Sequence, residues 1–174
     1  SLNLSTPQPK VIDKGWATTG TDNIREHNII NSLYIKTDES EQLNLRLQSK
    51  YEKIKQTEQR YEITNPDADI MLVAFGITSR IVKQAVEEAT SAGLSVGLLR
   101  PQTVWPFPSK AFEKIAKAYL TVELNSGQMI EDVKLEVNGR APVHFLGKMG
   151  GAVLSVDEIL NKIKEIAGGI NNAG

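Results

Sequence analysis

The last two thirds of the chain contain four short apolar runs separated by amphipathic segments. The runs lie at Asp69–Phe75, Val96–Leu99, Tyr119–Leu124 and Val143–Leu146. Their apolar residues are near-continuous rather than alternating, which is typical of strands buried on both faces of a parallel sheet. We therefore predict a sheet covered on both faces, with four strands that begin near Asp69, Leu94, Tyr119 and Pro142.

The segments between these runs have the spacing and the end signals of helices. Residues 79–92 place apolar side chains on one side and are followed by Gly93, a common residue after a helix end. Ser109 is a candidate cap for a short helix. The run Ser155–Glu158 has the form of a capping box and predicts the start of the last helix.

One segment fits two patterns. We predict a helix over 128–137, although Val133, Leu135 and Val137 also alternate as they would in a strand. Residues 61–63 are a candidate for a further short strand. The alternation of buried strands with helices predicts an α/β fold, a three-layer α/β/α sandwich with a mainly parallel sheet.

The first third of the chain is organised differently. Residues 1–37 show no helical or strand periodicity, yet they are apolar at Trp16 and at several Ile, Leu and Tyr positions. We expect this arm to lack regular structure and to bury Trp16 on its own domain or on a neighbour. Residues 39–57 have helical spacing after Asp38, a candidate N-cap. The expected parts are an extended arm and helix at 1–58, the α/β/α domain at 59–168 and a frayed tail at 169–174.

Composition excludes several classes of protein. The 174 residues carry a formal net charge of −1, which argues against a protein whose work is attraction to nucleic acid or anionic lipid. The chain has no cysteine, so it holds no iron–sulfur cluster, and its two histidines exclude a His-rich zinc site. No apolar run is long enough to span a bilayer, and we expect a soluble cytoplasmic protein. Because the chain starts at Ser1 rather than Met, we expect it to be part of something longer.

Polar residues gather in the loops after the predicted strands. Open sheets of this kind bind ligands outside the carboxyl ends of their strands, so these loops form the candidate site. The candidates are Arg100, Asn125, Gln128 and Lys148. Two cations and a helix amino end after Gly127 favour an anion. Alternatively, the cations pair with Glu123 or Asp132 and leave no net attraction. Neither a phosphate-binding P-loop nor a dinucleotide-binding glycine motif is present.

Five sequence blocks taken together resemble a known family. The blocks are Gly15–Gly20, Arg25–Tyr34, Leu99–Pro108, Val122–Met129 and Gly147–Gly151. Their order and spacing resemble the α subunit of 2-oxoacid:ferredoxin oxidoreductases, and the closest branch resembles the 2-ketoisovalerate (3-methyl-2-oxobutanoate) enzymes. The similarity covers the second domain of that subunit, which is similar to the transketolase C-terminal domain. Such a domain has a five-stranded mixed sheet with one antiparallel edge strand, and the pattern alone does not identify 61–63 as that strand.

The resemblance implies a specific function for the whole enzyme. Such enzymes oxidatively decarboxylate a 2-oxoacid on thiamine diphosphate and magnesium, pass electrons through iron–sulfur clusters to ferredoxin, and form an acyl-CoA. The Gly-Asp-Gly…Asn-Asn motif that holds the diphosphate and its metal is not present here. We therefore expect a non-catalytic domain, inactive alone, whose partners are thiamine-binding and ferredoxin-like subunits.

The same resemblance implies a role for the rim of the sheet, where Arg100, Asn125, Gln128 and Lys148 would contact coenzyme A or a partner subunit. The alternative from a different class is a stand-alone anion- or nucleotide-binding regulatory module. A third is the corresponding domain of a transketolase or a 2-oxoacid dehydrogenase, which the five blocks fit less well.

Overall fold

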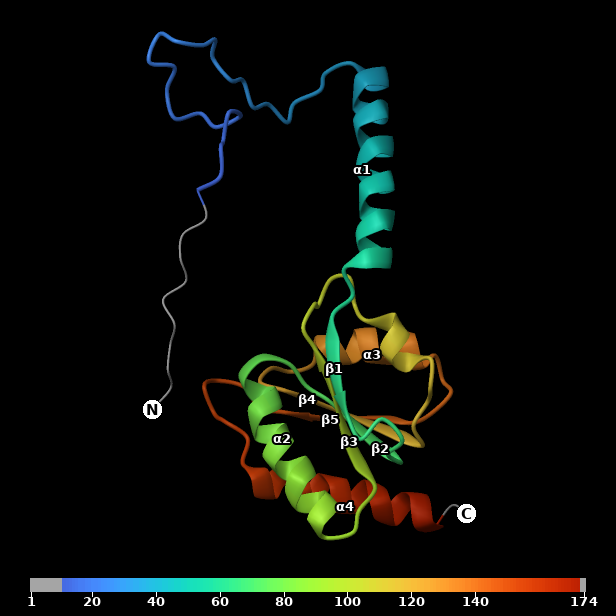
Figure 1. Cartoon of the computed structure of the whole chain (residues 1–174). Helices are drawn as coiled ribbons and strands as arrows, with labels where there is room; N and C mark the ends of the chain where they lie inside the picture. Colours follow the sequence, from blue (N-terminus) through green and yellow to red (C-terminus); the bar gives the residue numbers. More distant parts are fainter. Residues whose placement is uncertain (1–10, 173–174) are drawn as a thin grey trace. The chain divides into compact units, whose positions relative to one another are not determined.

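The computed structural model describes residues 11–172 (Figure 1). The described part of the chain divides into two units between Leu45 and Arg46, so that the boundary falls inside the first helix, α1 (Thr37–Thr57). The position of α1 agrees with the predicted helix at 39–57. Asp38 lies in the first turn of α1 rather than before it, so the prediction of Asp38 as an N-cap is wrong. The helix buries none of its residues.

The arm has no helix or strand in residues 11–36, as predicted. Two side chains make local hydrogen bonds in this arm. The Arg25 guanidinium donates to the Ala17 oxygen at 2.9 Å and to the Gly20 oxygen at 2.8 Å, and the Asn28 side-chain amide donates to the Ala17 oxygen at 3.0 Å and to the Gly15 oxygen at 2.7 Å. These bonds close a turn without forming a core, and Trp16 stays 66% exposed. The arm's own unit therefore does not bury Trp16, and its burial on the following domain or on a neighbour stays a prediction.

The second unit is built on a five-stranded sheet with the strand order β1-β3-β2-β4-β5. The strands are β1 (Tyr61–Thr64), β2 (Ile70–Val73), β3 (Val96–Pro101), β4 (Ala118–Glu123) and β5 (Val143–Gly147). The last four are parallel to one another, which confirms the four predicted strands. β1 pairs antiparallel with β3 at the edge, so residues 61–63 belong to the antiparallel edge strand that the resemblance implied.

One boundary in the sheet differs from the prediction. Arg100 was expected in a loop, but it belongs to β3, as does Pro101; the two residues lie opposite Glu62 and Tyr61 of β1. Proline has no N–H to donate to a neighbouring strand, and β3 ends at this residue. The side chain of Arg100, one of the four candidate site residues, therefore extends from a strand and not from a loop.

Helices cover both faces of the sheet, as Figure 1 shows. They are α2 (Gly76–Ser91), the short 3₁₀ helix η1 (Ser109–Phe112), α3 (Met129–Val137) and α4 (Val156–Asn172). Alternate residues of each strand face opposite layers: Ile70 and Leu72 of β2 pack with α2 and α4, whereas Met71 and Val73 pack with α3 and η1. The three-layer α/β/α prediction is confirmed, and so is the helix over 128–137.

The last helix shows the predicted capping box and ends later than expected. The Ser155 backbone N–H donates to the Glu158 carboxylate at 2.8 Å, and the Glu158 N–H donates to the Ser155 hydroxyl at 3.2 Å. α4 continues to Asn172, so a frayed tail from 169 is wrong up to that residue. Residues 173–174 lie outside the described part. Over residues 11–172, no helix has both the length and the apolar character needed to cross a membrane.

Candidate functional site

The candidate site lies where the four parallel strands end, and its central residue is Glu123. Glu123 is the last residue of β4, and its side chain is only 2% exposed. Because side chains alternate along a strand, Glu123 lies on the same face as Tyr119, which packs with α3. The strand therefore delivers a carboxylate to the layer that contains the amino end of α3.

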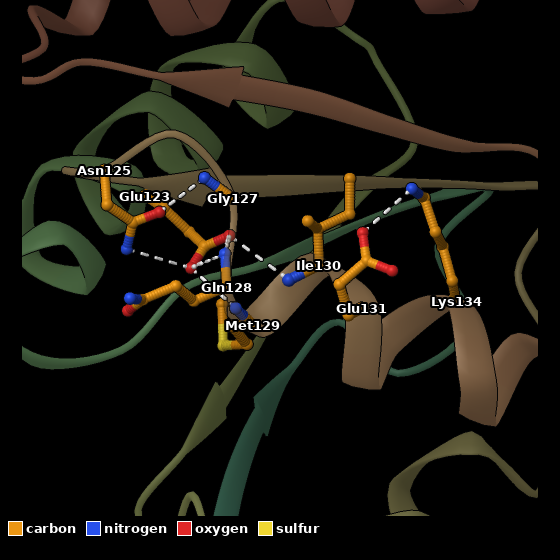
Figure 2. A network of polar contacts seen from close by, with 8 residues as sticks. All are labelled: Glu123, Asn125, Gly127, Gln128, Met129, Ile130, Glu131 and Lys134. Carbon is orange, nitrogen blue, oxygen red and sulfur yellow. Dashed lines mark hydrogen bonds and ion pairs between the residues drawn. The ribbon is translucent and has the colours of Figure 1, made fainter.

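The Glu123 carboxylate accepts hydrogen bonds from the first backbone N–H groups of α3 (Figure 2). Met129 donates at 2.8 Å, and Gln128 and Ile130 each donate at 3.2 Å. The Asn125 side-chain amide adds a weaker bond at 3.3 Å. A helix amino end has free N–H donors and a partial positive charge, both of which a carboxylate satisfies. The chain's own carboxylate thus occupies the position where we expected an external anion.

The turn between Glu123 and α3 is held by a second short contact. The Asn125 side-chain oxygen accepts a hydrogen bond from the Gly127 backbone N–H at 2.7 Å, which closes an Asx turn. Gly127 has a φ of +110°, a backbone conformation that glycine adopts without strain. The Asn–Ser–Gly sequence after β4 is therefore explained by the geometry that brings α3 onto Glu123.

The two candidate cations form ion pairs inside the chain. Lys148 Nζ lies 2.7 Å from a carboxylate oxygen of Glu158, and Arg100 Nη1 lies 2.9 Å from a carboxylate oxygen of Glu62. We expected Glu123 or Asp132 as the internal partner, and that assignment is wrong. The sequence could not identify the real partners, because each pair depends on the tertiary fold. Glu62 meets Arg100 only when β1 pairs with β3, and Glu158 meets Lys148 only when the start of α4 lies at the end of β5.

The structure brings three of the four predicted residues together. Asn125 and Gln128 both contact the Glu123 carboxylate, and the Lys148 backbone N–H donates to the Glu123 carbonyl at 3.2 Å. Arg100 is on β3, which β2 separates from β4. Adjacent strands lie roughly 4.8 Å apart, so Arg100 is at the same edge of the sheet but outside this cluster.

Electrostatics differ between the two sides of the cluster. Hydrogen bonds from Lys148 and from the Ser155 backbone lower the pKa of Glu158 to about 2. On α3, burial and the nearby Glu123 and Glu131 carboxylates raise the pKa of Asp132. Burial and Asp132 likewise raise the pKa of Glu136. The α3 side of the cluster is therefore acidic, and the only candidate cation beside it is already paired.

From the sequence, Glu123 was expected only as a partner for a cation. The available signal was its position: a carboxylate that ends an apolar strand, followed within five residues by a helix start. Within residues 11–172, no group of three or more His, Asp or Glu side chains could hold a metal ion. His144 is half-buried in β5, opposite Leu120 of β4.

Comparison with known proteins gives a consistent result. Residues 68–159 match the family described as pyruvate:ferredoxin oxidoreductase core domain II. The chain is 42% identical to the ketoisovalerate oxidoreductase subunit VorB of Methanothermobacter marburgensis over 164 residues, which is 92% of this chain and 46% of that protein. It is also 42% identical to the 2-oxoglutarate synthase subunit KorA of the same organism, over 100 residues, 56% of this chain and 27% of that protein. The chain thus spans less than half the length of these relatives.

Solved structures agree on the fold. The 2-oxoglutarate:ferredoxin oxidoreductase from Magnetococcus marinus, solved with 2-oxoglutarate, coenzyme A and succinyl-CoA bound, matches with a TM-score of 0.67 at 20% identity. The match covers 86% of this chain and 28% of that chain. An inactive β4 tetramer of a split-gene transketolase matches with a TM-score of 0.52 at 15% identity, over 61% of this chain and 40% of that chain. At these identities the likeness establishes a shared fold, which is transketolase-like.

Proposed function

This chain belongs to the pyruvate:ferredoxin oxidoreductase core domain II family, and from that premise we propose that it is one domain of a cytoplasmic, multisubunit 2-oxoacid:ferredoxin oxidoreductase that forms an acyl-CoA. 2-Ketoisovalerate is the proposed 2-oxoacid. The similarity to the ketoisovalerate enzyme subunit extends over 164 residues, whereas the similarity to the 2-oxoglutarate enzyme subunit extends over 100. The stand-alone regulatory module has no support, because both of these relatives are subunits of larger enzymes.

The proposed work of this domain is assembly of the enzyme. The supporting observation is a set of exposed large apolar side chains in the segments that follow β2, β3 and β5. We call this set the apolar rim: Phe75, Ile77, Val104, Trp105, Met149 and Val153. Exposed apolar side chains gathered at one edge are typical of protein interfaces. The internal pairing of Lys148 with Glu158 also favours an interface over an open anion site beside the apolar rim.

Thiamine diphosphate, magnesium and the iron–sulfur clusters are assigned to other domains or subunits. The residues described here do not fit a diphosphate–metal site. The amino end of α3 is taken by Glu123, the nearby cation Lys148 is paired with Glu158, and residues 11–172 hold no carboxylate or histidine cluster suited to a metal. Thiamine-binding and ferredoxin-like subunits are the proposed partners, with ferredoxin reached through the complex and coenzyme A as a substrate.

Co-purification of variants with the other subunits tests the assembly role. We expect Ile77→Asp with Met149→Asp to abolish co-purification while the far-ultraviolet circular dichroism of the chain stays unchanged. Leu135→Asp is the matched control, because Leu135 is an exposed apolar residue of α3 outside the apolar rim. Undiminished co-purification of the double variant, or equal loss with Leu135→Asp, would contradict the assembly role.

A second experiment separates an interface from a coenzyme A contact. In the assembled enzyme, Arg100→Ala with Lys148→Ala removes both candidate cations. If these side chains contact coenzyme A, the apparent dissociation constant for coenzyme A rises roughly tenfold or more, since a charge-assisted hydrogen bond contributes about 1.5–3 kcal/mol. If that dissociation constant is unchanged while subunit assembly weakens, Arg100 and Lys148 lie at a subunit interface. If neither changes, the functional assignment of these residues is wrong.

A further inference from the structure

A small depression lies between the first two turns of α2 and the antiparallel pair β1–β3. Its volume is about 220 Å³. The lining residues are Glu62, Thr64, Ser79, Arg80, Lys83, Leu98 and Arg100. It is separate from the Glu123 cluster, because β2 lies between β3 and β4. Pockets for whole small molecules usually measure roughly 300–1,000 Å³, so this depression suits a single chemical group.

The lining carries an excess of positive charge. Three cationic side chains and one carboxylate leave a net charge of +2. Both oxygens of the Glu62 carboxylate are engaged, one by Arg100 at 2.9 Å and the other by the Gln102 side-chain amide at 2.6 Å. Arg80 and Lys83 are exposed, and neither has an ion-pair partner among the described residues. Glu62 therefore holds Arg100 in place and leaves the other two charges uncompensated.

The position of Arg80 does not help the helix. A helix amino end carries a partial positive charge and is stabilised by acidic residues, not by basic ones. α2 has no acidic residue in its first turn, and Arg80, its fifth residue, follows that turn directly. The Arg100 Nε–H is also buried without an acceptor. Residues that lower the stability of their own surroundings are expected mainly at functional sites.

We propose that this depression binds one phosphate group, with Arg80 and Lys83 as direct contacts and Arg100 as a third contact positioned by Glu62. A phosphate monoester is close to a dianion at neutral pH, which matches the net charge of +2. Arginine offers a planar set of donors that fits phosphate oxygens. The Ser79 hydroxyl already donates to the Gly76 carbonyl at 2.7 Å, so Thr64 supplies the neutral donor. This site goes beyond the proposed assembly role and does not depend on it.

Titration of the whole chain with sodium phosphate, followed by ¹⁵N nuclear magnetic resonance, tests the site. Ionic strength is kept constant with sodium chloride. We expect saturable shifts at the Nε–H groups of Arg80 and Arg100 and at the backbone amides of 79–83. Shifts that do not saturate, or that spread over the surface, would overturn the proposal. Sodium acetate should bind more weakly, and equal or tighter acetate binding would also overturn it.

Charge-matched variants separate this site from general electrostatic attraction. Arg80→Gln with Lys83→Gln should raise the apparent Kd for phosphate tenfold or more. The control is Arg46→Gln with Lys50→Gln, which removes the same charge from exposed positions of α1. An equal rise in the control would mean non-specific attraction and would refute the site. Titration with adenosine 3′-monophosphate identifies the kind of ligand that carries the phosphate. An affinity equal to that of inorganic phosphate indicates that the phosphate alone is recognised, and a higher affinity indicates that the ligand is a nucleotide. Binding weaker than that of inorganic phosphate would contradict an open site for a phosphate monoester.

Discussion

The Glu123 carboxylate lies 2.8 Å from the Met129 backbone nitrogen and accepts its hydrogen bond inside a nearly solvent-free environment (Figure 2). This contact joins the end of a central strand to the start of the helix that covers it. A strand end followed by a helix amino end is the usual geometry for an external anion in open α/β sheets. Here a side chain of the same chain fills that role, so the contact stabilises the fold and does not recruit a ligand.

Glu123→Gln tests that stabilising role. The amide loses the negative charge and turns one hydrogen-bond acceptor into a donor that faces the α3 N–H groups. We expect the free energy of unfolding to fall by about 1–3 kcal/mol, because buried donors lose their partners. Urea denaturation measures the change. Glu131→Gln removes an exposed carboxylate of the same helix and should have an effect within about 0.5 kcal/mol. Equal stability of the two variants would show that the Glu123 contacts are not stabilising.

The ion pair of Glu158 with Lys148 predicts a pH dependence. The folded-state pKa of Glu158 is about 2, below its usual value of 4.5, so the folded state binds its proton more weakly than the unfolded state does. The stabilisation is therefore complete above pH 4.5 and is lost as the pH falls from 4.5 toward 2. Thermal unfolding should show a lower Tm for Glu158→Gln than for the wild type at pH 7, and the difference should shrink below pH 4.5.

Glutamine is the suitable replacement at this position because it can keep the capping-box hydrogen bond while losing the charge. Glu165→Gln is the control on the same helix, since Glu165 forms an exposed pair with Lys162 three residues away and should contribute little. A Tm difference for Glu158→Gln that does not vary between pH 7 and pH 3 would contradict the assigned cause.

Two glycine substitutions should have opposite effects on stability. An added Cβ at Gly97 of β3 would lie 2.5 Å from the Asn65 carbonyl oxygen and 2.8 Å from the Thr64 carbonyl oxygen. Gly97→Ala should therefore lower the free energy of unfolding by about 1–3 kcal/mol. Gly168 lies in α4 with open space around it, and Gly168→Ala should raise stability by about 0.5–1 kcal/mol. A neutral Gly168→Ala would indicate that the last turns of α4 do not contribute to folding.

The isolated chain should not bind thiamine diphosphate tightly. The α3 amino end and Lys148 are engaged internally, by Glu123 and Glu158, and residues 11–172 contain no cluster of His, Asp or Glu side chains to hold the magnesium ion that accompanies the diphosphate. Isothermal titration calorimetry with thiamine diphosphate and magnesium is the measurement, and a 2-oxoacid decarboxylation assay on the same sample should show no turnover. Saturable binding in the micromolar range would refute the assignment of the cofactor to other subunits.

Several features of this protein follow from local pattern. The four apolar runs, the glycine after the second predicted helix and the Ser155–Glu158 capping box all rely on neighbours in sequence, and the structure confirms each. A strand buried on both faces must be apolar at successive positions, and a helix end must satisfy its own backbone groups, so these signals are present in the order of the residues. They are sufficient for the α/β/α layers and for the edge at which the site lies.

Other features depend on strand order, which local pattern does not contain. Placing β3 next to β1 brings Arg100 opposite Glu62, and placing β2 between β3 and β4 separates Arg100 from the cluster at Glu123. The pairing of Lys148 with Glu158 likewise requires α4 to return to the end of β5. The sequence by itself determined which residues gather at the carboxyl edge. Only the tertiary structure decided which charges meet there, because ion pairs form between residues that are close in space, whatever their distance along the chain.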